Sequence, residues 1–235
     1  MTETIFITGA DKGLGFALTT RFLSAGFHVF AGTYLPDSNL PDLRAQFPQA
    51  LTIIPLDVRH MVSIRSAVKR VARHISGLDV LINNAGVHLE QQNTTLEQLD
   101  FSDHHLERTL AVNTFGPLRA TQQFLPLLAQ GGRKLIVNIS SEAGSIADCW
   151  RVGEFAYCMS KSALNMQAKL LQNALGPQGF KVLAVHPGWM RTDMGGAQAD
   201  ISADQSADGI FLLATRVWSP NDPIYLDYEG KALRW

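Results

Sequence analysis

The sequence predicts an α/β protein built on a doubly wound, mostly parallel sheet of seven strands with helices on both faces. Two observations lead to this prediction. Short apolar segments alternate with longer helical stretches from one end of the chain to the other. The short segments are apolar at successive positions, which is typical of parallel strands that are buried on both faces.

The expected elements follow one another in a regular order. The strands are the apolar runs at residues 4–8, 27–33, 51–55, 78–83, 134–140, 181–186 and 224–226. Between them, helices are expected over residues 13–25, 60–75, 101–129, 155–175 and 203–217. Residues 36–48 read as a loop with a short helix. Right-handed crossovers in such a sheet place ligands at the carboxyl ends of the strands.

Size and composition fit a single domain over residues 1–235. The chain is 46% hydrophobic, which is enough for a substantial core. Its 20 basic and 21 acidic residues form no block of like charge, so neither a nucleic-acid nor a membrane partner is indicated. Two cysteines make no disulfide framework and no four-cysteine metal site. With no apolar stretch long enough for a membrane span, we expect a cytoplasmic protein without a metal.

The first expected strand ends in a glycine-rich turn, TGADKGLG, at residues 8–15. Gly9, Gly13 and Gly15 allow backbone amides to approach a pyrophosphate and allow the next helix to start close to the sheet. A turn without a ligand is the alternative interpretation. Because a strand precedes the turn and a helix follows it, the pattern favours dinucleotide binding and a Rossmann fold.

Tyr157 and Lys161 are four residues apart in an expected helix, so their side chains share one face. An ammonium group one turn away favours the ionised phenol, and we expect it to lower the tyrosine pKa by about two units. Tyr157 would then be a usable proton donor. By itself, this spacing more often marks a pair on a helix surface.

Taken in order, these motifs resemble the short-chain dehydrogenase/reductase family. The glycine loop has the family's spacing, and the other marks are Asn83-Asn84-Ala85-Gly86, Asn113, Ser140-Ser141, Tyr157 with Lys161, and Pro187-Gly188. The sequence at residues 141–146, the loop 147–154 and the segments 160–166, 186–194 and 228–235 are most similar to the branch of C-factor and sniffer-type carbonyl reductases.

The resemblance implies an NADP-dependent oxidoreductase that transfers a hydride between nicotinamide and a small carbonyl or alcohol substrate. Its catalytic set would be Asn113, Ser141, Tyr157 and Lys161. In the family, the tyrosine protonates the substrate oxygen, which the serine polarises. The lysine binds the ribose and lowers the tyrosine pKa, and the asparagine holds a water that connects the lysine to solvent. A purely structural buried asparagine is the alternative for Asn113.

The resemblance also implies a set of cofactor-binding residues. Asp57 would approach the adenine ring and Thr192 the nicotinamide carboxamide, although each could instead cap a helix. Asn84 and Gly86 would line the nicotinamide side, or form a plain turn. The full expected set is Gly9, Asp11, Lys12, Gly13, Leu14, Gly15, Thr33, Tyr34, Asp57, Val58, Asn84, Ala85, Gly86, Tyr157, Lys161, Pro187, Gly188, Met190 and Thr192.

NADP(H) is favoured over NAD(H), which stays the alternative cofactor. Thr33 and Tyr34 occupy the end of the second strand, where NAD enzymes carry an acidic residue. Lys12 stands where NADP-preferring relatives carry a basic residue, unless it is only a solvated lysine. A second basic residue, expected near position 34, is missing.

An apolar or aromatic carbonyl substrate is expected from the candidate pocket residues His88, Trp150, Phe155, Trp189, Met190 and Met194. Each of these could equally be core packing. Ser141 and Tyr157 are 16 positions apart, which is longer than usual in the family, and the extra length lies in the loop 147–154 beside the pocket. Residues 193–202 are expected to form a mobile lid, or an ordinary surface loop.

Two other functions compete with the enzyme. A nucleotide-binding signalling or regulatory protein of C-factor type would keep the fold with little turnover, and a third interpretation is a reductase-like partner inside a complex. Having Tyr157, Lys161, Ser141 and Asn113 together favours the enzyme, since a binding protein needs only the glycine loop. Relatives of this kind associate through helices such as 101–129 and 155–175, so a homodimer or homotetramer is expected.

Overall fold

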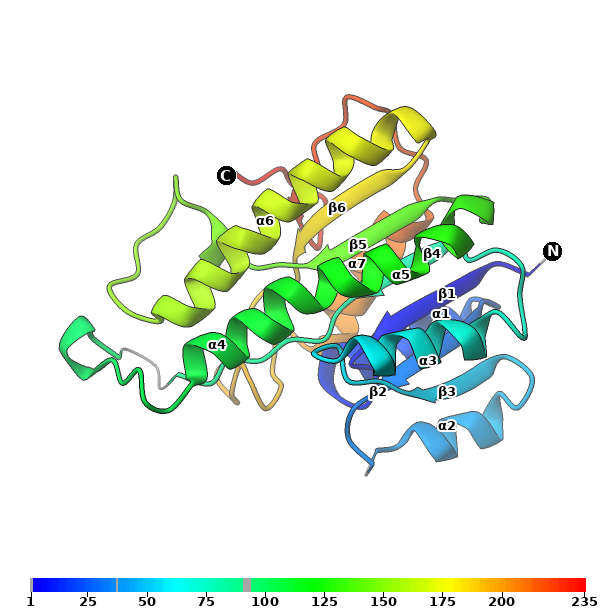
Figure 1. Ribbon diagram of the computed structural model, residues 1–235, viewed down its shortest axis with the longest axis horizontal. Helices are drawn as coiled ribbons and strands as arrows, with labels where there is room; N and C mark the ends of the chain where they lie inside the picture. The colour runs from blue at the N-terminus through cyan, green and yellow to red at the C-terminus, as the bar shows by residue number, and fades with distance from the viewer. Residues whose placement is uncertain (1, 37, 91–93) are drawn as a thin grey trace.

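A parallel β-sheet forms the centre of the computed structural model, which describes residues 2–36, 38–90 and 94–235 (Figure 1). Within these residues the sheet has seven strands in the order β3-β2-β1-β4-β5-β6-β7. Every neighbouring pair of strands is parallel. The doubly wound sheet that the sequence predicts is therefore confirmed.

The strands are buried on both faces, as their continuous apolar sequences indicate. Ile5 and Ile7 pack in one core cluster and Phe6 in the other, because successive side chains of a strand point to opposite faces. All seven expected strands occur, with ends that shift by at most two residues. Their bounds are β1 (Thr4–Thr8), β2 (His28–Thr33), β3 (Leu51–Pro55), β4 (Val80–Asn83), β5 (Leu135–Ile139), β6 (Lys181–His186) and β7 (Tyr225–Asp227).

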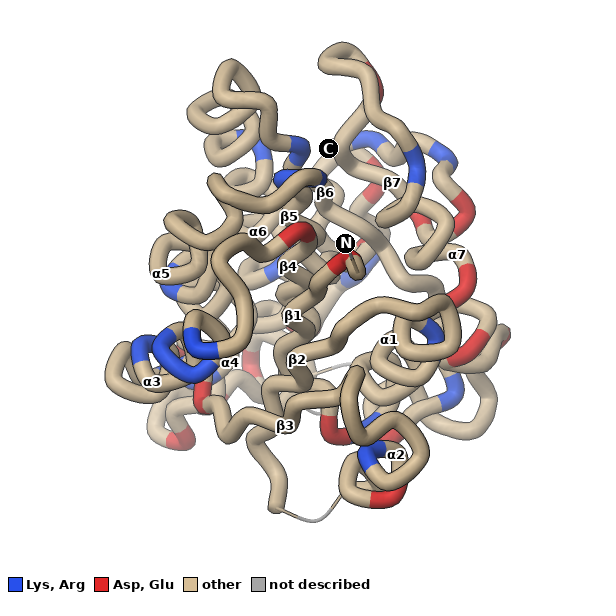
Figure 2. Tube along the Cα trace, turned by 90° about the vertical axis from the view of Figure 1, so that its right-hand side faces the viewer, with Lys and Arg blue, Asp and Glu red and all other residues tan. Residues whose placement is uncertain are grey.

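Helices cover both faces of the sheet, and Figure 2 shows the two layers on either side of the strands. One layer holds α1 (Gly13–Ser24), α2 (Leu40–Gln46) and α7 (Ala203–Thr215). The other holds α3 (Met61–Val71), α5 (Gly116–Gln130) and α6 (Phe155–Leu175). In the described part of the chain, none of the helices has the length and apolar character needed to cross a membrane.

The region expected to be one long helix over residues 101–129 is interrupted. Helix α4 (His105–Leu110) leads into a π-helical turn, Ala111–Phe115, and only then does α5 begin. Asn113 lies in this turn, where its side chain accepts a hydrogen bond from Val87 N and donates one to Val87 O, both at 2.8 Å. Single π turns inside helices are frequent at functional sites. The helical region therefore begins at His105 rather than at residue 101, and it is irregular at Asn113 because this buried asparagine binds the extension of the neighbouring strand.

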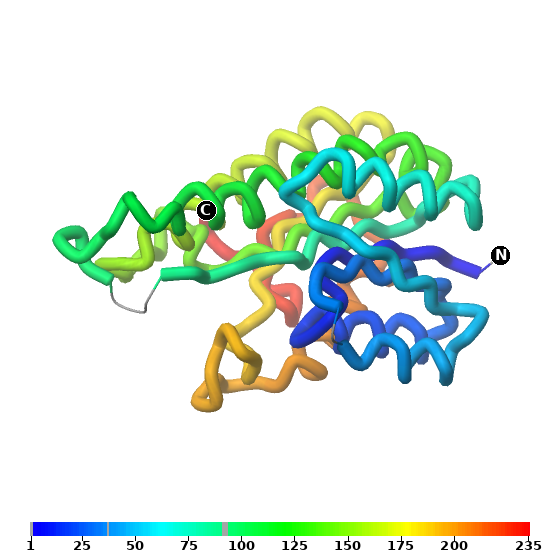
Figure 3. Tube along the Cα trace, turned by 60° about the horizontal axis from the view of Figure 1, so that its bottom comes forward, coloured from blue at the N-terminus to red at the C-terminus, as the bar shows by residue number. Residues whose placement is uncertain are grey.

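Strands β1 and β4 are neighbours, yet the chain leaves them toward opposite edges of the sheet. This switch in strand order opens a crevice at their carboxyl ends, which is where doubly wound sheets bind ligands. The segment that follows β6, drawn in gold in Figure 3, projects from the layered body of the molecule. The glycine loop and this segment flank the entrance to the site.

Candidate active site

A cavity of about 1550 Å³ lies at the carboxyl ends of the parallel strands. Its lining comes from the glycine loop, from the residues that follow β2 to β6, and from the segments 150–154 and 186–203. This volume exceeds the roughly 300–1,000 Å³ that is typical of a site for one small ligand. It suits a dinucleotide and a substrate together.

Most of the predicted site residues line this cavity, but within the described structure three of them do not. The Thr33 hydroxyl donates to Leu35 O at 2.8 Å, so its side chain serves its own loop. Phe155 precedes Tyr157 by two positions on α6, and residues at that spacing face different ways. Thr33 and Phe155 are thus absent from the described cavity lining, and their contacts with cofactor and substrate stay predictions. Asn113 lies behind Val87, so its expected role is indirect.

The glycine loop has the geometry of an anion-binding turn. Gly9 has a φ of +63°, and a Cβ there would lie 2.9 Å from the Ala85 Cα. A Cβ on Gly15 would lie 2.0 Å from Gly9 O, so both positions require glycine. The first turn of α1 contains no acidic residue and no side-chain cap, so its amides and helix dipole favour a negatively charged group. These residues fit the pyrophosphate of a dinucleotide.

Asn84 joins the end of β4 to this loop. Its amide group donates to Thr8 O and Gly9 O, both at 2.9 Å. The Thr8 hydroxyl in turn accepts from the backbone amides of Asn84 and Ala85, again at 2.9 Å. The two strands at the switch point are thus fastened to each other where the ligand would lie.

The adenosine end contains a cation that the sequence analysis missed. Arg59 follows β3 and lines the cavity, and its Nη2 atom lies 3.1 Å from the Tyr34 hydroxyl and 2.7 Å from Asp57 Oδ2. The Asp11 side chain binds the same region, because its Oδ1 atom accepts a hydrogen bond from the backbone N–H of Tyr34 at 3.2 Å. A basic side chain from the loop after β3 thus lies beside Tyr34, near which the sequence itself has no basic residue.

Lys12 also lines the cavity, but its ammonium group has a partner. The Nζ atom lies 2.7 Å from Asp193 Oδ2, in the segment expected to form a lid. Both side chains are exposed to solvent. Thr192 is close as well, since a Cβ on Gly13 would lie 3.5 Å from its methyl carbon. The lid segment and the glycine loop are therefore in direct contact.

Ser141, Tyr157 and Lys161 meet in the middle of the cavity. The Lys161 ammonium lies 5.6 Å from the centre of the Tyr157 ring and donates to Ile139 O at 2.9 Å. Ser141 follows β5, and its hydroxyl donates to Glu142 Oε2 at 2.8 Å. The three groups needed to hold a carbonyl oxygen, protonate it and stabilise the resulting charge thus share one space.

Burial determines the charge states of this group. It raises the pKa of Tyr157 to about 12, although a hydrogen bond with Ser141 acts in the opposite direction. It lowers the pKa of Lys161 to about 8. The expectation that Lys161 lowers the Tyr157 pKa is wrong for this structure, because removal from water disfavours the charged forms of both groups. At pH 7 the phenol is neutral and Lys161 is mostly protonated.

The substrate side of the cavity carries the expected aromatic and sulfur-containing residues His88, Trp150, Trp189, Met190 and Met194. His88 stacks on the Tyr157 ring, with 4.6 Å between ring centres. Charged residues that the sequence analysis did not assign lie beside them: Glu142, Arg151 and Glu154. In the sequence, the unusual length of the loop 147–154 is the feature that points to two of them, because this loop contains Arg151 and Glu154. The wall is therefore not the purely apolar one that was expected.

Comparison with known proteins gives consistent matches. The family model for short chain dehydrogenases matches residues 3–202. The C-signal protein of Myxococcus xanthus is 38% identical over 158 residues, which are 67% of this chain and 93% of that protein. NADPH-bound carbonyl reductase from chicken fatty liver is 32% identical with a TM-score of 0.90, over 100% of this chain and 99% of that one. The carbonyl reductase Sniffer of D. melanogaster is 30% identical with a TM-score of 0.91, over the whole of both chains.

The match to the family extends from β1 to the start of α7, and the two structural similarities cover the full length of the chain. The region matched by the family model contains the glycine loop, Asn113, Ser141, Tyr157 and Lys161. The chain therefore belongs to the short-chain dehydrogenase family and is an oxidoreductase.

Proposed function

We propose that this protein is an NADP-dependent oxidoreductase that transfers a hydride between nicotinamide and a small carbonyl or alcohol substrate. The observation that carries the proposal is the meeting of Ser141, Tyr157 and Lys161 in one cavity with an anion-binding glycine loop. A nucleotide-binding protein without catalysis would need only the loop. The likeness to the NADPH-bound chicken carbonyl reductase supports the same reaction class.

Tyr157 is the proton donor in this proposal. With a pKa of about 12 its phenol keeps its proton at neutral pH, which suits the protonation of an oxygen that gains negative charge. Bound NADPH supplies the hydride to the carbonyl carbon. Ser141 orients the oxygen, and the Lys161 cation stabilises the phenolate that Tyr157 leaves behind. A neutral phenol is the form that the reduction of a carbonyl requires of Tyr157.

Asn113 supports the site from outside the cavity. Its amide group donates to Val87 O and to Ser160 Oγ, which joins the strand β4 extension to the helix that carries Lys161. Gly86 stands between the two side chains: a Cβ there would lie 3.5 Å from Asn113 Oδ1 and 3.8 Å from Lys161 Nζ. This arrangement supports a role for Asn113 in supplying protons to Lys161 through water.

The preference for NADP(H) over NAD(H) rests on two cations at the adenosine end. Lys12 and Arg59 both line the cavity, and guanidinium groups suit phosphate recognition. Each cation has a carboxylate partner, Asp193 for Lys12 and Asp57 for Arg59, and Asp11 accepts a hydrogen bond from Tyr34 N. The residues present therefore fit a ribose that carries a 2′-phosphate better than one with a free hydroxyl.

A cofactor-consumption screen tests the proposed function. The protein is incubated with NADPH or NADH and a panel of aldehydes, ketones, quinones and pteridines, and the absorbance of the reduced cofactor is followed. We expect turnover of at least one compound class, with NADPH preferred. Absence of turnover with every compound, while NADPH still binds, would refute the assignment as a working reductase.

The likeness to the C-signal protein of M. xanthus favours a second candidate, a signalling or regulatory protein that binds nucleotide with little turnover. The same screen separates the two candidates, because only the enzyme consumes NADPH. A regulatory protein would show cofactor binding alone.

We also propose a homodimer or homotetramer. Exposed apolar side chains lie along α5 and α6, including Leu118, Met166 and Leu170. Such faces are typical of contacts between subunits. Light scattering coupled to size-exclusion chromatography measures the mass directly, and a monomer at micromolar concentration would contradict this proposal.

A further inference from the structure

A chain of charged side chains forms one wall of the cavity beside the catalytic tyrosine. Arg151 lies between two carboxylates, with Nη2 2.7 Å from Glu142 Oε1 and Nε 2.7 Å from Glu154 Oε2. The side chains of Arg151 and Glu154 are 18% and 17% exposed, so the pair is largely withdrawn from water. All three residues line the cavity.

This wall touches the reacting groups directly. Glu142 accepts a hydrogen bond from the Ser141 hydroxyl at 2.8 Å. Glu154 Oε1 lies 3.5 Å from His88 Nε2, and the His88 ring stacks on Tyr157. A substrate whose carbonyl oxygen reaches Ser141 and Tyr157 would therefore place its other groups against these carboxylates.

Negative charge exceeds positive charge along the wall. Burial opposes the ionisation of Glu142, but hydrogen bonds from Arg151 and Ser141 outweigh it, and the pKa of Glu142 is lowered. Arg151 is the single cation against Glu142 and Glu154 among the described lining residues of this wall. Because its Nη2 and Nε atoms already bind carboxylates, an anionic substrate would have to compete with both of them.

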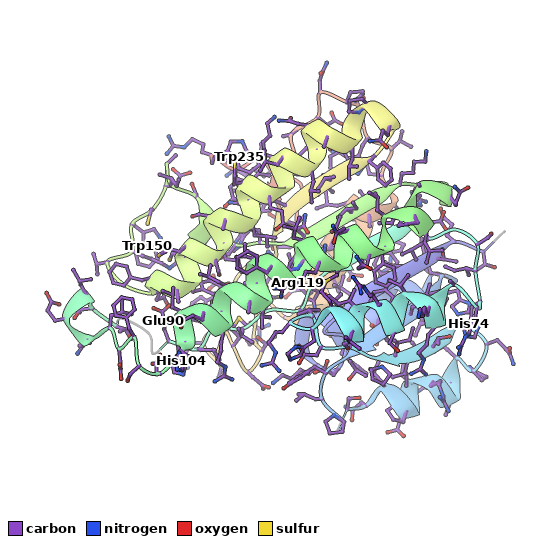
Figure 4. The ribbon with its side chains drawn as sticks, viewed as in Figure 1. His74, Glu90, His104, Arg119, Trp150 and Trp235 are labelled. Carbon is purple, nitrogen blue, oxygen red and sulfur yellow. The ribbon has the colours of Figure 1, made fainter. Side chains whose placement is uncertain are left out.

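A further acidic residue, Glu90, binds the first turn of α6. Glu90 Oε2 accepts from Tyr157 N at 2.9 Å, at the start of α6. Its other oxygen, Oε1, is buried and has no hydrogen-bond partner among the residues that the structure describes. Figure 4 shows Glu90 and Trp150 beside the first turn of α6. Glu90 thus adds a third acidic side chain, behind Glu142 and Glu154, close to Tyr157.

We propose that the substrate of this site is a carbonyl compound that also carries a cationic, hydrogen-bond-donating group such as an amidinium or ammonium, which Glu154 and Glu142 receive. The inference rests on the proposed function, and it assigns the substrate class. Glu154 and Glu142 are then specificity-determining residues. The extended loop 147–154 contains both Arg151 and Glu154, and its residues 150–154 line the cavity.

Binding of unreactive probes tests the inference without any turnover. Benzamidine, benzamide and benzoate are nearly the same shape and differ in charge, so their dissociation constants can be compared by calorimetry on the full chain with NADP⁺ present and absent. We expect benzamidine to bind at least about tenfold more tightly than benzoate, as is typical of a charge-assisted hydrogen bond. Glu154→Gln should reduce this ratio by about the same factor, and Glu142→Gln should reduce it too.

Asp148→Asn is the matched control, because Asp148 lies in the same loop, pairs with Arg234 and is absent from the described cavity lining. It should leave the ratio unchanged. Tighter binding of benzoate, or a ratio that neither Glu154→Gln nor Glu142→Gln alters, would overturn the inference even if the wild-type protein is an active reductase.

Turnover gives a second, separate readout. The benzaldehydes that carry amidine, carboxamide or carboxylate at position 3 or 4 are compared with 4-nitrobenzaldehyde, which controls for electron withdrawal. The aldehyde that carries the amidine should have the highest kcat/KM of these three compounds. Glu154→Gln should lower kcat/KM for the amidine and leave it unchanged for the others. No turnover of any aldehyde would count against the proposed function, whereas equal loss for all aldehydes in Glu154→Gln would count against the subsite.

Discussion

Arg59 donates a hydrogen bond to the hydroxyl of Tyr34 at 3.1 Å, which brings a cation from the loop after β3 to the end of β2. Asp57 holds the same guanidinium through two hydrogen bonds to Nε and one to Nη2. In doubly wound sheets the adenosine ribose lies at the end of β2. In the proposed NADP-dependent enzyme, residues that follow two different strands would together recognise the 2′ position.

Arg59→Gln should weaken NADPH binding by about tenfold, because a charge-assisted hydrogen bond to the 2′-phosphate is lost. NADH has no such phosphate and should bind as before. Fluorescence titration of both cofactors measures the change, and 2′-AMP against 5′-AMP isolates the phosphate. Arg65→Gln, at an exposed position of α3, is the matched control. Equal effects on NADPH and NADH would show that Arg59 only holds Asp57.

Tyr157→Phe should lower kcat for carbonyl reduction by several orders of magnitude, since the proton donor is removed while the ring remains. The ring stacks on His88, and that contact survives the substitution. NADPH affinity should therefore change little. Single-turnover kinetics measure the loss of rate, and cofactor titration measures the NADPH affinity. A variant with comparable turnover would show that another group donates the proton.

The rate of reduction should fall as pH rises through about 8. Burial lowers the pKa of Lys161 from 10.5 to about 8, so the cation beside Tyr157 is present below this pH and is lost above it. A pH profile of kcat/KM measures the midpoint. In Lys161→Arg the guanidinium stays charged, so whatever activity remains should lack this limb. A flat wild-type profile between pH 7 and 9 would contradict the assignment.

Tyr225→Phe should lower both stability and turnover. The Tyr225 hydroxyl is buried and donates to Ser141 O at 2.7 Å, which fixes the backbone that carries the catalytic hydroxyl. Loss of one buried hydrogen bond typically costs about 1 kcal/mol in unfolding free energy. Urea denaturation and steady-state kinetics give the two values. If the variant were less stable with an unchanged kcat, the contact would be structural only.

The sheet and the glycine loop could be predicted because their signals are local. Continuous apolar runs specify buried parallel strands, and the glycines specify a turn that no other residue fits, as the close contacts of Gly9 and Gly15 show. The spacing of Tyr157 and Lys161 likewise placed both side chains at one cavity.

What the sequence did not reveal depends on burial and on contacts between distant segments. The Tyr157 pKa was misjudged because the Coulomb attraction of Lys161 is visible in the sequence, whereas the loss of water around both groups is not. Arg59 was missed because its distance to Tyr34 depends on the register of β2 and β3. The wall of Glu142, Arg151 and Glu154 was missed for a similar reason, since a long loop must fold back before its charges meet.

The ion pair between Lys12 and Asp193 joins the glycine loop to the segment after β6 at the cavity. Both groups face solvent, where charges are screened over a Debye length of about 8 Å at physiological ionic strength. We therefore expect this ion pair to break at little cost, so that a nucleotide phosphate could replace the carboxylate as the partner of Lys12. Salt should accelerate cofactor association by weakening this ion pair. It should also slow association by weakening the long-range attraction between the cofactor phosphates and the protein. The association rate is therefore expected to depend only weakly on ionic strength.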